Sequence, residues 1–235
     1  MRTTSSPTST GRSNGHSTTG LSAWLTIAAI LIVLGFAGQA ASDGMEGSSD
    51  LFYEYGLALS SLVIYGILVG LTIWTASAYG DPFQALGLTV FSIKWAGIAV
   101  GLILLVLGLS FVLEPILHAG EEQGYAPDVW RPEHSRAFFV NGVVAATFVP
   151  FAEELFFRGL GVRVLAFLGS AAGMAGTALV FGLAHGILAA LPVLVAFGFA
   201  LAWVRLRSGS VWPGVVAHGL FNALAVVAVY AELTN

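Results

Sequence analysis

Long apolar runs are the feature of this sequence that most limits its possible folds. The first is 21–41, and further runs follow at about 51–79, 95–113, 137–168, 171–189, 191–204 and 211–232. A helix needs roughly 20 apolar residues to cross the hydrocarbon core of a bilayer. Within lipid, backbone N–H and C=O groups must be paired inside the segment, so such runs fold as helices. The sequence therefore predicts an all-α, polytopic transmembrane helix bundle of about seven helices, with six to eight possible.

Composition agrees with this fold and narrows the possible chemistry. Apolar residues make up 57% of the 235 residues and charged residues 9%, whereas a soluble domain has about 25% charged residues. The chain has no cysteine, which excludes disulfides, a thiolate nucleophile and cysteine-bound zinc. We expect the lipid bilayer to be a partner and nucleic acid not to be one, while the oligomeric state is left open.

Three segments are expected along the chain. Residues 1–20 are rich in Ser, Thr and Gly and predict a disordered N-terminal tail. Residues 21–136 predict the N-terminal transmembrane helices with one long hydrophilic loop, at 114–136, where Tyr125 and Trp130 suit a membrane interface. Residues 137–235 predict a catalytic transmembrane core. The run 21–41 has no clear cleavage site, so we expect a retained first helix rather than a signal peptide.

Positive charges indicate how the helices are oriented. Lys and Arg in short loops favour the cytoplasmic side. If the N-terminus is cytoplasmic and the helices alternate, that side receives Arg2, Arg12, Lys94, Arg158, Arg163, Arg205 and Arg207. The other side receives Arg131 and Arg136, within an acidic loop. The abundance of Ala, Gly, Val and Leu indicates a GC-rich prokaryotic genome. We therefore expect a protein of the prokaryotic plasma membrane with a cytoplasmic N-terminus, an external 114–136 loop and an external C-terminus.

Two pairs of glycines have the spacing of close helix contacts. Gly66 and Gly70 share a helix face, and so do Gly97 and Gly101. Small residues at this spacing let transmembrane helices approach closely, and we expect packing rather than chemistry from them. Asn141 is expected to join helices by a hydrogen bond, and Glu54 to reach the membrane interface.

Ionisable residues within the apolar runs are costly and by default mark a functional site. The first group is Glu153, Glu154 and Arg158. Glu154 and Arg158 are four residues apart and are expected to form an ion pair on one helix face. Glu153 is rotated from this face, so it is free to face a cavity and act as a general base. The alternative is an interfacial Glu/Arg cluster at a helix end.

Two more groups follow on later helices. His185 lies four residues after Phe181, whose ring is expected to pack against the imidazole; the alternative is a histidine used only for packing. His218 and Asn222 are also four apart and together offer two hydrogen-bond donors that could stabilise an oxyanion. The alternative is polar contact between helices. The remaining apolar runs carry few ionisable groups, which favours one shared site for all three groups.

The three groups, in this order, resemble the motifs of the CAAX protease and bacteriocin-processing family of intramembrane glutamic endopeptidases. They read Glu153-Glu154-xxx-Arg158, Phe181-xxx-His185 and His218-xxx-Asn222, and the resemblance covers about 150–226. It implies hydrolysis of a peptide or protein substrate at the membrane without a cofactor or metal. Glu153 and His185 would activate a water, His218 and Asn222 would hold the oxyanion, and Glu154 and Arg158 would brace the first helix.

Glu153 and His185 can meet only if they lie at the same depth in the membrane, and this requirement sets the length of the fourth helix. A helix that stopped at Glu153 would leave that carboxylate at the cytoplasmic edge, far from His185. We therefore predict that this helix runs on to Arg163 or Leu168. Three other functions are weighed against the peptidase: a zinc-dependent membrane protease using one Glu and two His, a non-catalytic immunity or scaffold protein, and a small proton-coupled transporter.

Overall fold

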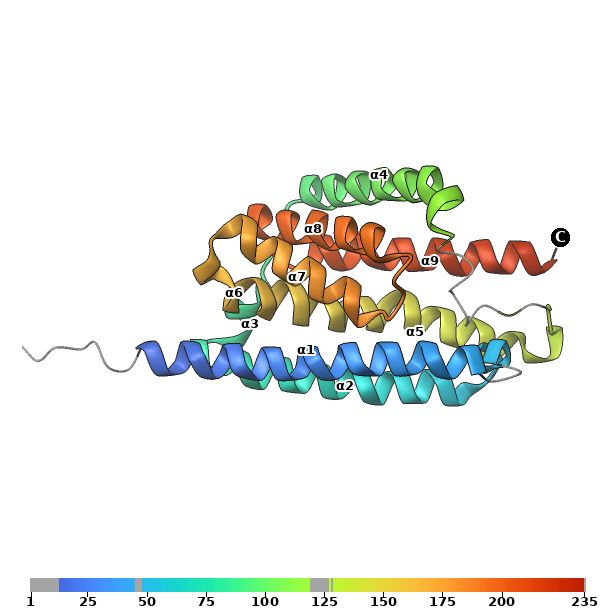
Figure 1. Ribbon diagram of the computed structural model, residues 1–235, viewed down its shortest axis with the longest axis horizontal. Helices are drawn as coiled ribbons and strands as arrows, with labels where there is room; N and C mark the ends of the chain where they lie inside the picture. The colour runs from blue at the N-terminus through green and yellow to red at the C-terminus, as the bar shows by residue number, and fades with distance from the viewer. Residues whose placement is uncertain (1–12, 45–47, 119–126, 128, 235) are drawn as a thin grey trace, which may run out of the picture.

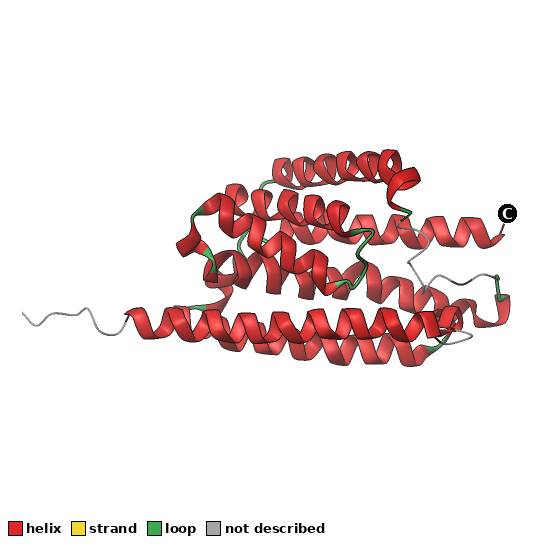
Figure 2. Ribbon diagram, viewed as in Figure 1, coloured by secondary structure: helices red, strands yellow, loops and turns green. Residues whose placement is uncertain are grey.

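The computed structural model describes residues 13–44, 48–118, 127 and 129–234, and within these it is helical without strands (Figure 2). The longer helices are α1 (Ser13–Gly44), α2 (Tyr55–Ala76), α4 (Ile93–Leu117), α5 (Ser135–Glu153), α7 (Ser170–Ala184), α8 (Leu191–Ser208) and α9 (Trp212–Thr234). The shorter elements are η1 (Ser48–Tyr53), η2 (Ser77–Tyr79), α3 (Pro82–Leu86), η4 (Pro132–His134), η5 (Glu154–Gly161), α6 (Val162–Val164) and η6 (Ala166–Leu168). Tyr125 lies outside the described residues.

Six of these helical stretches are long and apolar enough to cross a membrane. The exception among the longer helices is α7, which has 15 residues. This confirms an all-α polytopic bundle of the predicted size, and the protein is an integral membrane protein. The buried core joins both halves of the chain, since Trp24, Leu68 and Ile103 belong to the same cluster as Phe181 and Leu201.

The long helices lie roughly parallel to one axis (Figure 1). α2 and α5 pack together, α5 packs on α9, and α4 covers α8 and α9. α7 and α8 form a tightly packed hairpin that reaches less far along the bundle than α5 and α9 do (Figure 1). The end of this hairpin therefore lies inside the bundle.

A close backbone contact fixes the tip of the hairpin. α7 ends at Ala184, and Gly186 takes a φ of +74°, which a side chain would disfavour. A Cβ at Gly186 would lie 2.5 Å from the carbonyl carbon of Gly35 in α1. The predicted run 171–189 is thus too long, because this turn breaks the helix before its apolar sequence ends.

The predicted extension of the fourth helix is confirmed. Helical structure continues from Pro132 to Val164, through the π-helical segment η5 and into α6. Pro150 lies within α5 and lacks the N–H that would bond the carbonyl of Ala146. π-helical turns inside α-helices are frequent at functional sites, and η5 contains Glu154 and Arg158 of the first motif and directly follows Glu153.

Two expectations about the first half of the chain are wrong. α1 begins at Ser13, so residues 13–20 are helical rather than part of a disordered tail. Extending a helix that has already formed costs far less than starting one, which lets the polar residues join it. A Cβ added at Gly66, Gly70, Gly97 or Gly101 would meet no atom within 4 Å. These glycines therefore face away from the described bundle and do not mediate its packing; their spacing arises readily in a chain with 29 glycines.

Charge divides the two ends of the bundle. Lys94, Arg163, Arg205 and Arg207 lie near the end where α1 begins and α8 finishes (Figure 1). At the opposite end Arg131 is bound to Asp50, with 2.8 Å between Nη2 and Oδ1. Asn141 there joins α5 to the start of α2 by donating to the carbonyls of Phe52 and Glu54, as expected.

Candidate active site

Both glutamates of the first motif point into the protein. Glu153 is the last residue of α5 and Glu154 the first of the π-helical segment, and their exposed fractions are 8% and 0%. In a regular helix neighbouring side chains differ by about 100° in direction. The wide π-helical turn keeps Arg158, 1% exposed, on the buried side as well.

Glu154 and Arg158 form the predicted ion pair, with Arg158 Nη1 2.9 Å from Glu154 Oε1. The guanidinium carbon lies 4.1 Å from the centre of the Phe181 ring, a cation–π arrangement. Gly198 on α8 makes room for this packing, since a Cβ there would be 3.3 Å from Arg158 Nη2. Arg158 is therefore internal, and the expectation that it lies at the cytoplasmic boundary is wrong.

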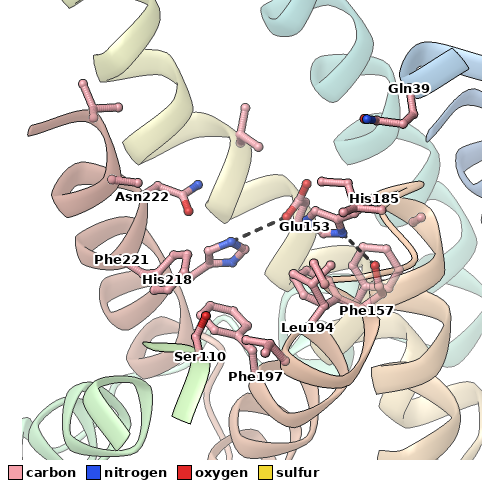
Figure 3. Close-up of a pocket in the computed structure, with 18 of the residues that line it drawn as sticks. Gln39, Ser110, Glu153, Phe157, His185, Leu194, Phe197, His218, Phe221 and Asn222 are labelled. Atoms are coloured by element: carbon pink, nitrogen blue, oxygen red, sulfur yellow. Dashed lines mark hydrogen bonds and ion pairs between the residues drawn. The ribbon is translucent and has the colours of Figure 1, made fainter. Parts of the chain in front are cut away.

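His218 stands between the two glutamates. Its Nδ1 lies 3.1 Å from Glu154 Oε1. Its Nε2 lies 3.7 Å from Glu153 Oε2 (Figure 3). An ionised carboxylate only accepts hydrogen bonds, so we assign the proton of the close contact to Nδ1. Gly214, one turn earlier on α9, permits this approach, because a Cβ there would lie 2.6 Å from Glu154 Oε2. The sequence spacing did not reveal this bridge.

Glu153 has a second partner that the motifs do not include. The phenol of Tyr65, in the middle of α2, donates to Glu153 Oε1 at 2.9 Å. A buried tyrosine hydroxyl usually finds a hydrogen-bond partner, so a tyrosine within an apolar run could have been noticed. Its partner could not have been identified, because the two residues are 88 positions apart.

His185 is the residue directly after α7, at the tip of the hairpin. Its Nδ1 lies 2.8 Å from the carbonyl oxygen of Phe181, and its ring centre lies 4.6 Å from that of Phe181. The predicted packing of Phe181 on His185 is therefore confirmed. Because a carbonyl oxygen only accepts, Nδ1 carries the proton and Nε2 keeps its lone pair when the ring is neutral.

Asn222 links α9 to α5. Its Nδ2 donates to the carbonyl of Ala145 at 2.8 Å. Gly219 brings the same turn of α9 close to the next carbonyl, since its added Cβ would lie 2.6 Å from Ala146 O. This is the polar contact between helices that the alternative interpretation predicts. The hydrogen bond to Ala145 uses one of the two amide N–H groups of Asn222 and leaves the other available.

A cavity of about 660 Å³ joins these groups. Its walls include Glu153, His185, His218 and Asn222, as well as Phe181 and Tyr65, while most of the remaining lining is apolar (Figure 3). Glu154 and Arg158 lie behind the cavity wall rather than in it. Four side chains from three different motifs thus meet water-accessible space at the centre of the bundle.

The donor atoms that the described residues place around this cavity contact other protein groups. Among the described residues, no three or more His, Cys, Asp or Glu side chains are grouped so that they could hold a metal ion. Tyr65 and His218 instead contact the two oxygens of Glu153, and Nδ1 of each histidine contacts a protein oxygen. When the His185 ring is neutral, its Nε2 keeps a lone pair that none of these contacts uses.

Comparison with known proteins gives one match. Residues 135–224 match the family described as Rce1-like, type II CAAX prenyl endopeptidase Rce1-like. No curated protein and no solved structure matches the chain. The matched stretch contains all three motifs and confirms the resemblance that they predict. Residues 135–224 are therefore similar to a CAAX-protease family of membrane peptidases, and they lie in a bundle of apolar helices long enough to cross a membrane.

Proposed function

We propose that the protein is an intramembrane endopeptidase in which Glu153 activates a water molecule for hydrolysis of a peptide bond. The observation that carries this proposal is the convergence of Glu153, His185, His218 and Asn222 on one largely apolar cavity. A carboxylate that faces such a cavity, while its neighbour Glu154 is neutralised by Arg158, has the environment of a general base. The division into N-terminal helices and a catalytic core at 137–235 belongs to the same proposal.

The proposed hydrolysis begins with the activation of the water. Glu153 takes a proton from a water whose oxygen attacks the carbonyl carbon of the substrate, and the C=O electron pair moves onto oxygen. The resulting tetrahedral intermediate then re-forms its C=O bond and breaks the C–N bond. Glu153 returns the proton to the departing nitrogen, so the products are a carboxyl group and an amine. No covalent intermediate with the enzyme forms.

The histidines and Asn222 take complementary roles. Nε2 of neutral His185 accepts a hydrogen bond and so orients the water against Glu153. His218, when doubly protonated, donates from Nε2 on the Glu153 side, and Asn222 donates its remaining amide N–H. Donors fixed in a water-poor cavity stabilise a developing oxyanion more strongly than water does. Tyr65 holds Oε1 of Glu153, and the water would bind Oε2, which lies 3.7 Å from His218 Nε2.

The experiment that tests this function compares membrane peptides by mass spectrometry between cells with the wild-type protein and cells with Glu153→Ala. New peptide ends should be present only with the wild type. Purified protein should then cleave the same peptides in ¹⁸O-labelled water, and one ¹⁸O should appear in each new carboxyl group. A non-catalytic scaffold or a proton-coupled transporter predicts identical peptides in the two strains.

A further inference from the structure

We propose that the substrate is an apolar stretch of an extracytoplasmic peptide, which reaches the catalytic cavity from the outer side of the membrane. This inference rests on the proposed function, because it concerns the route to the same site. On this proposal the protein does not process protein tails in the cytoplasm. Three features carry it: the direction in which the cavity extends, the packing on its other side, and the charge at the two ends of the bundle.

Among the described residues, the lining of the cavity reaches from the catalytic residues to one end of the bundle. Beyond Glu153 its walls include Gln39 near the end of α1, Phe52 in η1, and Ser110 and Glu114 in the last turns of α4. α1 and α4 finish at the end of the bundle where α2 begins (Figure 1). The cavity is therefore continuous from Glu153 to residues near this end of the bundle, beside the packed rings of Tyr53 and Phe138.

The other half of the bundle is filled by large side chains. Trp24, Phe156, Leu160, Leu201 and Val204 are at most 1% exposed, and none of them lines the cavity. The indole of Trp24 donates to the carbonyl of Phe156 at 3.3 Å and stacks on the Phe156 ring. Protein interiors packed in this way leave few voids larger than a water molecule. Within the described residues, the site is therefore closed towards the end where α1 begins.

The charge distribution identifies the closed end as cytoplasmic. Arg158 is internal and is not counted with either end. The closed end holds Lys94, Arg163, Arg205 and Arg207. The end reached by the cavity holds several carboxylates together with Arg131 and Arg136, and Arg131 is paired with Asp50. An excess of Lys and Arg marks the cytoplasmic side of membrane proteins. The cavity therefore extends towards the exterior.

The lining of the cavity defines the chemistry of the substrate. Near the catalytic groups it consists mainly of Leu194, Phe197, Phe221, Ala225 and Val226. A charged substrate side chain placed against these apolar groups would lose hydration that they cannot replace. We therefore assign an apolar sequence to both sides of the cleaved bond, as found in exported peptides and in the outer ends of membrane anchors.

Single cysteines test the route, because the chain has none of its own. Ser110→Cys places a thiol in the cavity wall, and Ser170→Cys places a matched thiol at the exposed start of α7 on the closed end. A charged, membrane-impermeant thiol reagent should modify Ser110→Cys in intact cells and Ser170→Cys only after permeabilisation. Modification of Ser110→Cys only after permeabilisation, with Ser170→Cys modified in intact cells, would overturn the proposal.

Activity provides the second measurement. An apolar peptide identified as a substrate should be cleaved when added to intact cells and not when added to sealed inverted membrane vesicles. A bulky thiol adduct on Ser110→Cys should lower kcat/KM by at least about tenfold, because it occupies volume that the peptide needs for alignment. The same adduct on Ser170→Cys should leave it unchanged. Cleavage only in inverted vesicles would refute the external route, whereas accessible thiols with no cleavage in either preparation would refute the proposed peptidase function alone.

Discussion

The phenol of Tyr65 donates to Oε1 of Glu153 at 2.9 Å, and this contact joins the N-terminal helices to the motif that carries the proposed base. α2 and α5 pack against each other along their length, which holds the contact in place. The N-terminal helices therefore supply a part of the site as well as a wall around it.

Replacing Tyr65 by Phe tests this contact. The substitution keeps the ring and removes only the hydroxyl, so the protein should remain folded. Loss of a hydrogen bond to a charged group corresponds to about 1.5–3 kcal/mol, and kcat should fall by about tenfold to a hundredfold with a smaller change in KM. Tyr55→Phe, at an exposed position on the same helix, is the matched control. Equal kcat values for the two variants would show that Tyr65 does not position Glu153.

Replacing Glu153 by Gln should separate chemistry from folding. The amide has nearly the same volume as the carboxylate but cannot take a proton from water, so cleavage should fall by at least about a hundredfold. The purified yield and thermal midpoint should stay close to those of the wild type, because a neutral amide is easier to bury than a charge. Normal cleavage by this variant would mean that the base has been assigned to the wrong carboxylate.

Replacing Glu154 by Gln should act mainly on stability. The change leaves the buried Arg158 without its opposite charge, and breaking a buried ion pair in this way costs about 3–5 kcal/mol. It also weakens the hold on His218 Nδ1, so the folded fraction should turn over more slowly. The measurements are thermal midpoint and cleavage rate per folded molecule.

The double variant Glu154→Gln with Arg158→Gln should recover part of the lost stability, since no lone charge remains. It should not recover the part of the turnover that depends on the contact between Glu154 and His218. A double variant no more stable than Glu154→Gln would argue against the ion pair as the source of the loss.

Two glycine substitutions give a matched test of the packing around the site. Gly214→Ala would place a methyl group 2.6 Å from Glu154 Oε2, and such overpacking costs about 1–3 kcal/mol. Gly66→Ala meets no atom within 4 Å, and removal of a helical glycine favours the folded state by about 0.5–1 kcal/mol. The thermal midpoint should therefore fall for the first variant and stay equal or rise for the second. A similar fall in both would show that helix propensity, rather than contact with Glu154, controls the outcome.

Chelators should leave cleavage unchanged, because the proposed chemistry uses Glu153 and the histidines without an ion. The measurement is kcat/KM before and after prolonged treatment with a strong zinc chelator. Inactivation that is reversed by added zinc would instead favour the zinc protease that the one Glu and two His allow.

Some of these features could be predicted from the sequence and others could not. The ion pair of Glu154 with Arg158 and the packing of Phe181 on His185 follow from a spacing of four residues within one helical stretch. The continued fourth helix follows from the requirement that Glu153 and His185 share a depth. For contacts between separate helices, the sequence has no comparable spacing from which a contact could be predicted. The bridge from His218 to both glutamates, the hydroxyl of Tyr65 and the link from Asn222 to Ala145 all depend on how distant helices dock.

The interior position of Arg158 and the outward direction of the four spaced glycines were missed for a related reason. Periodicity indicates which residues share a helix face, but not which face meets the bundle. The turn at Gly186 was also missed, because the apolar sequence continues past it while the close contact with Gly35 ends the helix. The end of α7 is decided by the approach of α1 to the tip of the hairpin, and the sequence of residues 184–190 does not reveal that approach.

The shared acceptor Glu154 Oε1 has a consequence for the newly made protein. It receives Arg158 from its own helix and His218 from α9, and α9 follows every other part of the site in the chain. During synthesis on the ribosome, His218 is therefore made after the glutamates, Tyr65 and His185. We expect the nascent chain to lack the proposed oxyanion donors of α9 until that helix inserts, so the proposed peptidase activity should begin only when the bundle is complete.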